Sequence, residues 1–326
     1  MTYEPQPWTL EDLLPEPGTA EHTQYLKETE AQLASFEKRR DDLAVDMPEE
    51  AFLEILAEYE ALYAAASRLV AYGYLYFSQD TADEEALAFR SQAQQFLADF
   101  KNRTLFFDLW WKSLDDEAAA RLMEHSGDLR YFLESLRRFK PHTLSEPEER
   151  LINIKDVNGI STVLTLYDMI TTGFTYHFTV DGEEKELTRG QLTNYAFSAD
   201  AELRKAAYQE LYRVYGEQSD VLAQIYAARV RDWRAENVEL REFASPISVQ
   251  NLENDVPDAV VETLFQVIRQ NVGLFQRYFR FKADALGMER LGRYDIYAPL
   301  TEAEKSYSFD EAVQMVDEAY RTFSPV

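Results

Sequence analysis

The most restrictive feature of the sequence is an apolar pattern between residues 52 and 73. Apolar residues recur there at intervals of three and four, which is the spacing of one face of an α-helix. The positions are Phe52, Ile55, Leu56, Tyr59, Leu62, Tyr63, Ala66, Leu69, Val70 and Gly73. Pro48 suits the first turn of such a helix, because its ring fixes φ near the helical value. The pattern predicts a long amphipathic helix whose stripe packs in a core.

Helices are expected along most of the chain, because only 11 glycines and 11 prolines interrupt its 326 residues. A short element at 8–14 precedes a helix over 21–43. Capping motifs, in which a hydroxyl and a carboxylate or amide satisfy free amides, begin further helices at 81–84, 145–148, 188–191 and 308–311. Other helices are predicted over 115–124, 129–140, 200–242 and 257–287, with a turn at Ser245-Pro246. The fold class is therefore mainly α.

One segment follows a different period. Phe174, Tyr176, Phe178 and Val180 alternate with polar residues, and Asp181-Gly182 then precedes a polar run over 183–187. Alternation with a period of two followed by Asp-Gly is typical of a β-hairpin. We place a domain boundary after it, near residue 187, and expect a second, short β-like segment at 295–300.

Charge and composition narrow the function classes. The 33 Lys and Arg against 59 Asp and Glu give a net charge of −26, which repels nucleic acid and anionic membranes alike. Most of these acids are expected on solvated helix faces. The chain has no cysteine, which excludes disulfides and thiolate chemistry. Residues 1–10 lack the pattern of a signal peptide and no long uncharged apolar run follows, so we expect a cytoplasmic protein without membrane spans.

Motifs for known chemistries are incomplete. The four histidines are His22, His125, His142 and His177, and none lies in the H-E-x-x-H spacing of a zinc peptidase or three residues after a glutamate. We expect ordinary surface or half-buried histidines. Ser161 fails the G-x-S-x-G pattern of a hydrolase and lies in a predicted helix. The acids at 41–46 lack the spacing of a magnesium cluster. No catalytic, cofactor-binding or metal-ligating residue is assigned to this chain.

Several stretches, taken together, carry a family resemblance. The most specific are YFRFKADALG at 278–287 and YDIYAPL at 294–300. Others are WTLEDL at 8–13, Leu144-Ser145 with Glu148, Leu187-Thr188 after the hairpin, DAELRKA at 200–206, and FASP at 243–246 with Asn251-Leu252 and Asn254. In this order they resemble the oligoendopeptidase F family of zinc metallopeptidases, the M3B type of family M3.

The resemblance implies a multi-helix, neurolysin-like or zincin-like peptidase scaffold with a small β-hairpin. Residues 1–187 would form an N-terminal helical domain, and residues 188–326 the first, helical part of the peptidase domain. The family's zinc helix and its further ligands would lie beyond the position matching Val326. The chain would then form the wall of a channel that admits short, unfolded peptides, without the active site. It would be inactive and metal-free in isolation, and would need the missing C-terminal catalytic part.

An alternative from another class remains open. The same scaffold could serve a non-catalytic helical protein that binds peptides or a partner chain. An H-E-x-x-H motif in the reading frame after Val326 would favour the enzyme, whereas a stop codon there would favour the binding protein. A truncated chain should also expose apolar surface and self-associate.

Overall fold

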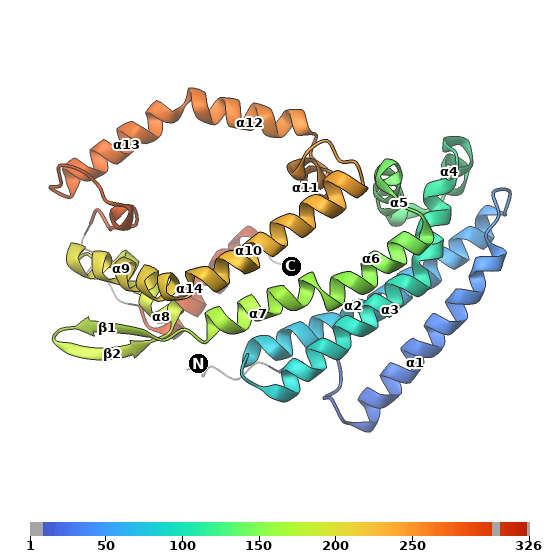
Figure 1. The fold of residues 1–326 in the computed structure, drawn as a ribbon, viewed down its shortest axis with the longest axis horizontal. Helices are drawn as coiled ribbons and strands as arrows, with labels where there is room; N and C mark the ends of the chain where they lie inside the picture. The colour runs from blue at the N-terminus through green and yellow to red at the C-terminus, as the bar shows by residue number, and fades with distance from the viewer. Residues whose placement is uncertain (1–8, 302–306, 325–326) are drawn as a thin grey trace. The chain divides into compact units, whose positions relative to one another are not determined.

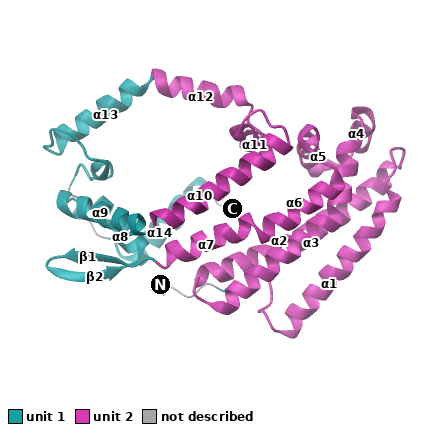
Figure 2. Ribbon diagram, viewed as in Figure 1, with its two compact units in different colours: residues 1–9, 174–217, 271–326 teal, residues 10–173, 218–270 magenta. Residues whose placement is uncertain are grey.

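The computed structural model describes residues 9–301 and 307–324, and these are mostly helical (Figure 1). The chain divides into two compact units (Figure 2). We call the one built from residues 10–173 and 218–270 the larger unit, and the one containing 174–217 and 271–326 the smaller unit. These units are defined by internal packing, so the domain boundary at residue 187 stays a prediction.

The larger unit contains most of the helices. In chain order these are α1 (Ala20–Phe36), α2 (Glu49–Gln79), α3 (Glu84–Ser113), α4 (Asp116–Leu122), α5 (Arg130–Arg138), α6 (Glu146–Asn158), α7 (Ile160–Thr172), α10 (Ser219–Trp233), α11 (Pro246–Glu253) and α12 (Asp258–Gln270). Short 3-10 turns lie at Glu37–Asp42, Gly127–Leu129 and Lys140–His142, and a π-helix at Arg234–Leu240 follows α10. The predicted helices at 115–124 and 129–140 correspond to α4 and α5.

The predicted stripe on α2 forms the core of the larger unit. Phe52 is fully buried and stacks on Trp111 of α3, with ring centroids 5.2 Å apart. Tyr59 packs on Phe107 at 4.7 Å. The buried Trp111 indole donates a hydrogen bond to the Leu133 carbonyl at 2.9 Å, which satisfies its only polar group. The stripe differs from the prediction at Tyr63, which is 54% exposed.

Three of the four predicted capping motifs are confirmed, at Ser145, Thr188 and Ser308. The motif at 81–84 is wrong. Asp83 caps α3, because its carboxylate accepts hydrogen bonds from the Glu85 and Ala86 amides at 2.8 and 3.2 Å. The Thr81 hydroxyl instead bonds to that of Thr172. A carboxylate next to the helix start displaced the more distant hydroxyl.

Other boundaries also differ from the prediction. Ser245-Pro246 is not a turn but the start of α11, since Ser245 caps the helix and Pro246 fills its first position. The helix expected over 257–287 breaks at Asn271 into α12 and α13 (Val272–Ala285). The one expected over 200–242 divides into α9 (Ala201–Glu217), α10 and the π-helix. The element expected at 8–14 begins outside the described residues. Its described part is a turn, closed by a hydrogen bond from the Leu13 amide to the Leu10 carbonyl.

The smaller unit is built around the predicted hairpin. Strands β1 (Tyr176–Val180) and β2 (Glu183–Leu187) pair antiparallel, and Asp181 and Gly182 both have positive φ at the turn. Alternate β1 residues, Tyr176 and Phe178, are buried against α8 (Arg189–Asn194) and α9. The unit also contains α13 and α14 (Phe309–Phe323).

The β-like segment predicted at 295–300 is wrong. The chain forms a 3-10 turn at Arg293–Asp295 and continues to residue 301, where this described range ends, without a strand. The Asp295 carboxylate accepts a hydrogen bond from the Gly292 amide at 2.9 Å, which closes the turn. None of the described helices is long and apolar enough to cross a bilayer.

Candidate functional site: a polar cavity in the larger unit

A cavity of about 450 Å³ opens in the larger unit between α2, α3, α5, α6, the π-helix and α11. One part of its lining is aromatic and the other is charged. The aromatic residues are Tyr59, Tyr63, Phe100, Phe132, Phe139 and Phe243, and the charged ones are Lys101, Asp108, Lys112, Glu149, Glu236, Arg241 and Glu253. Aromatic rings beside convergent polar groups are common in ligand sites, although the charged share of this lining is large.

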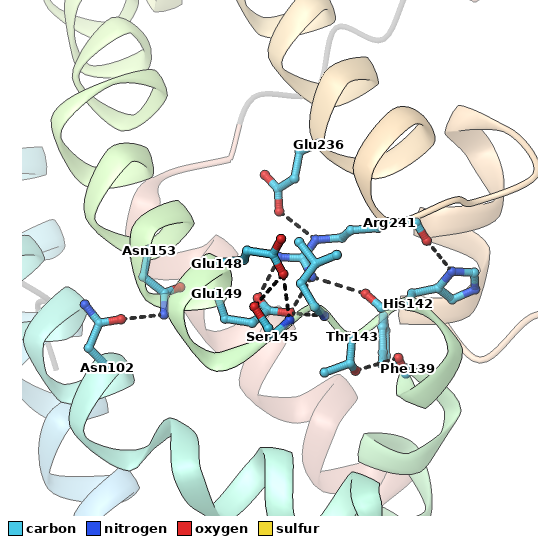
Figure 3. A network of polar contacts seen from close by, with 11 residues as sticks. Asn102, Phe139, His142, Thr143, Ser145, Glu148, Glu149, Asn153, Glu236 and Arg241 are labelled. Carbon is cyan, nitrogen blue, oxygen red and sulfur yellow. Dashed lines mark hydrogen bonds and ion pairs between the residues drawn. The ribbon is translucent and has the colours of Figure 1, made fainter.

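Arg241 organises the charged part (Figure 3). Its two terminal nitrogens donate to the two carboxylate oxygens of Glu149, each at 2.8 Å, and its Nε donates to Glu236 at 2.8 Å. Burial raises the pKa of Glu149, but hydrogen bonds from Arg241 and the Leu144 amide outweigh it and leave that pKa below its ordinary value. The Glu149 carboxylate is therefore held ionised beside a guanidinium that fixes its position.

His142 joins this network through the backbone. Its Nδ1 donates to the Arg241 carbonyl at 2.7 Å, and its own carbonyl accepts from Arg241 at 3.2 Å. Its ring stacks on Phe243 with centroids 3.6 Å apart. The imidazole thus ties the segment after the π-helix to the end of α5.

Two further carboxyl groups lie on the cavity wall or near it. Asp108 accepts a hydrogen bond from the Tyr59 hydroxyl at 3.2 Å, and burial raises its pKa. Asp156, on the next turn of α6 after the cavity-lining Asn153, has a pKa raised to about 6 by burial and by the negative charges of Glu236 and Asp232. Acids in such surroundings hold protons at higher pH than free aspartate.

The arrangement can bind a polar ligand, but the described lining offers no set of groups for bond cleavage. Ser145 lies close by, and its hydroxyl is 2.6 Å from Glu148 (Figure 3). This pair is the exposed capping box of α6, without an imidazole to accept a proton. We therefore interpret the cavity as a binding surface.

Among the four histidines, Ser161 and the acids at 41–46, which the sequence analysis weighed as possible site residues, only His142 lines this cavity. His125 and His177 are exposed and His142 is half-buried, as expected. The expectation for His22 is wrong, because this residue is buried, with Nδ1 3.0 Å from the Pro15 carbonyl. Ser161 lies inside α7, as predicted. Asp41, Asp42 and Asp46 are exposed, and the first two end the 3-10 turn at Glu37–Asp42.

Sequence reasoning missed the main residues of the cavity. Glu149 and Arg241 are 92 residues apart and belong to no common motif. In the smaller unit, Arg204 and Asp295 form a buried ion pair at 2.7 Å across 91 residues. The Arg204–Asp295 pair could have been suspected from the sequence. Its members lie in two of the stretches that carry the family resemblance, 200–206 and 294–300.

Two family models match the chain. The N-terminal model described as oligopeptidase F matches residues 110–176, and the model described as peptidase family M3 matches residues 194–323. The chain belongs to peptidase family M3. Both halves of the sequence thus carry M3 signatures, in chain order.

Curated relatives and a solved structure agree with the M3 assignment. Group B oligopeptidase PepB of Streptococcus agalactiae is 27% identical over 294 residues, covering 85% of this chain and 47% of the relative. Oligopeptidase PepF of Bacillus subtilis is 24% identical over 313 residues, which cover 94% of this chain and 46% of the relative. The chain thus spans about half the length of these relatives. Oligoendopeptidase F from Enterococcus faecium has the same fold, with a TM-score of 0.74 and 19% identity over 92% of this chain and 63% of that one.

The zinc that the resemblance implies for M3 peptidases does not fit the described residues of this chain. Only one group there brings three possible ligands together, namely Glu49, Glu124 and His125. It has one imidazole, and both Glu124 and His125 are exposed. One Glu49 oxygen already accepts from the amide and from Nδ1 of His125, at 2.8 and 2.9 Å, which raises the pKa of His125. A surface ion pair explains this group, so no step is derived through a metal.

Proposed function

We propose that this chain is the N-terminal part of a zinc-dependent oligoendopeptidase that hydrolyses short, unfolded peptides. The observation that carries the proposal is the succession of the two M3 matches over 110–176 and 194–323. In this proposal residues 1–187 form the N-terminal helical domain and residues 188–326 begin the peptidase domain. The zinc ligands and the general base lie on a segment outside the 326 residues.

In the proposed enzyme, the chain supplies part of the wall along which the peptide lies. The polar cavity supports this role, because its rings can pack on side chains while Glu253 and Asp108 can accept hydrogen bonds from backbone amides. Two carboxylates hold Arg241, so its guanidinium forms part of the cavity wall and is not available to a ligand. The aromatic rings, Asp108 and Glu253 remain available to bind one.

The proposed partner is the C-terminal catalytic part. Helix α12 supports this, because one apolar series on it is 44–56% exposed: Val260, Leu264, Phe265, Val267 and Ile268. Apolar series of this length are normally covered by another element. Neither nucleic acid nor a membrane is a proposed partner, and the proposed location is the cytoplasm, which fractionation of cells expressing the native gene would test.

Metal content and cleavage test the proposal together. The purified 326-residue chain should contain far less than one zinc per chain by mass spectrometry and should not cleave quenched fluorogenic peptides. A polypeptide extended through an H-E-x-x-H motif of the same reading frame should bind one zinc and cleave them. Its Glu→Gln variant in that motif should keep the zinc and lose cleavage.

Two outcomes would contradict the proposal. One tightly bound zinc in the 326-residue chain would place the metal site inside it. A stop codon directly after Val326, with no other gene product restoring cleavage, would favour the non-catalytic peptide-binding or partner-binding protein.

A further inference from the structure

A second, smaller pocket lies within the smaller unit, and no part of the proposed catalytic function uses it. It measures about 170 Å³ and lies between α8, α9 and the segment after α13. Four tyrosines dominate its lining: Tyr208, Tyr212, Tyr294 and Tyr297. An apolar protein cavity of about 150 Å³ is large enough to bind benzene. The pocket therefore has room for one ring-sized group.

An unsatisfied donor belongs to the lining of this pocket. Arg204 is only 2% exposed, and its terminal nitrogens donate to the carbonyls of Ser198 and Ala199 and to Asp295, at 2.7–2.9 Å. Its Nε is buried and has no hydrogen-bond partner. A buried donor without a partner destabilises the fold, because it has lost its hydrogen bond to water and gained none. Because this atom is inaccessible from the pocket, Arg204 forms part of the wall and does not donate to a ligand.

A second guanidinium lies at the exposed edge of the same pocket. Arg293 is exposed, and its guanidinium carbon lies 5.8 Å from the centre of the Tyr297 ring. None of the ion pairs found among the described residues involves Arg293. Arginine favours carboxylates because its planar group donates two parallel hydrogen bonds.

The pocket wall is fixed by the backbone around it. A Cβ atom at Gly292 would lie 2.7 Å from the Tyr294 ring, so only glycine lets this ring pack so closely. Lys282 is buried and donates to the Ile296 carbonyl at 2.6 Å, which holds the segment after the 3-10 turn. The Tyr294 ring and the buried Arg204 are thus positioned before any ligand arrives, which lowers the entropic cost of binding.

We propose that this pocket binds the C-terminal residue of a peptide that ends in an aromatic side chain. The ring occupies the space between the tyrosines, and the terminal carboxylate accepts hydrogen bonds from Arg293. The peptide's role as substrate or product rests on the proposed peptidase function, whereas binding itself does not. Binding is measurable on the chain alone.

The test compares two ligands that differ only in charge. The full 326-residue chain is titrated with N-acetylphenylalanine and with its amide at 0.15 M salt, followed by calorimetry. We expect the acid to bind about tenfold more tightly, since hydrogen bonds to a charged group are stronger than those to a neutral one. N-acetylalanine should bind more weakly than N-acetylphenylalanine, because it leaves the ring space empty.

Variants assign the effect to residues. Arg293→Gln should remove the preference for the acid, and circular dichroism should show that the fold is retained. Arg290→Gln is the matched control, because Arg290 is exposed, carries the same charge and does not line the pocket.

Three results would overturn the inference: no saturable binding of either phenylalanine ligand, equal affinity for acid and amide, or an unchanged preference in Arg293→Gln. These results are distinct from a failure of the proposed function. An extended polypeptide that binds the acid but cleaves no peptide would contradict the peptidase proposal alone. One that cleaves peptides but does not bind the acid would contradict only the pocket.

Discussion

Helices α2 and α12 carry the same sequence pattern and have opposite surroundings. Both show apolar residues at intervals of three and four. On α2, Phe52, Ile55 and Leu56 are at most 2% exposed, whereas on α12 Leu264 and Phe265 are 56% and 47% exposed. The pattern therefore determines that a helix has an apolar face. It does not determine what covers that face, because the covering element can lie anywhere in the chain or outside it.

The comparison predicts its largest effect in the core. Phe52→Ala should lower the free energy of unfolding by about 3–5 kcal/mol, because it removes a buried ring and leaves a cavity against Trp111. Phe265→Ala, the matched change on α12, should cost a small fraction of that. Urea unfolding of both variants measures the difference. Similar losses in both would mean that the face of α12 is already covered in solution.

Ion pairs should show the same contrast. Removing one partner of a buried pair should lower stability more than removing one partner of a more exposed pair. Asp295→Asn should cost about 3–5 kcal/mol, because it leaves the 2%-exposed Arg204 guanidinium without its counter-ion. Glu58→Gln removes the partner of Arg39 at a pair whose side chains are 34% and 41% exposed, and it should change stability far less. Thermal unfolding at constant pH compares them. Equal effects would contradict the inference that burial decides the cost.

The half-buried Asp156 should have an intermediate effect on the free energy of unfolding, and this effect should depend on pH. The pKa of Asp156 is raised to about 6 in the folded chain by burial, Glu236 and Asp232, and lowered in part by Lys101 and Arg241. The folded state therefore binds more protons than the unfolded state between about pH 4 and 6, so stability falls as pH rises through this window. The full shift corresponds to about 3 kcal/mol, which screening by solvent reduces to about 1 kcal/mol.

Asp156→Asn should accordingly stabilise the chain by about 1 kcal/mol at pH 7.5 and have little effect near pH 4. Urea unfolding at both pH values checks this. Glu60→Gln is the control, because Glu60 is an exposed acid within α2. A stabilisation that is the same at both pH values would contradict the assignment to the Asp156 proton.

The smallest effect on unfolding is expected on α12 itself. Leu264→Gln should leave the free energy of unfolding nearly unchanged, because the side chain is already 56% exposed. It should weaken the concentration-dependent self-association that we predict for the chain. Sedimentation velocity measures this, with Glu262→Gln on the same helix as control. A wild-type chain that stays monomeric at high concentration would contradict the prediction.

The local part of the fold was predictable from the sequence, and the cavities were not. The caps at Ser145, Thr188 and Ser308 and the turn at Asp181-Gly182 depend on residues within four positions of each other. The prediction failed at Thr81, where two possible caps lie close together, and at 295–300, where a side chain closed a turn in place of a strand.

What the sequence determined by itself was therefore the set of amphipathic helices, the hairpin and, through short matching stretches, the M3 family. Helix and hairpin signals are local, since the atoms that bond lie a few residues apart. Only the tertiary structure decided that Arg241 meets Glu149, that Arg204 meets Asp295 with its Nε left unpaired, and that the face of α12 is exposed. Each depends on packing between segments whose separation along the chain carries no periodic signal.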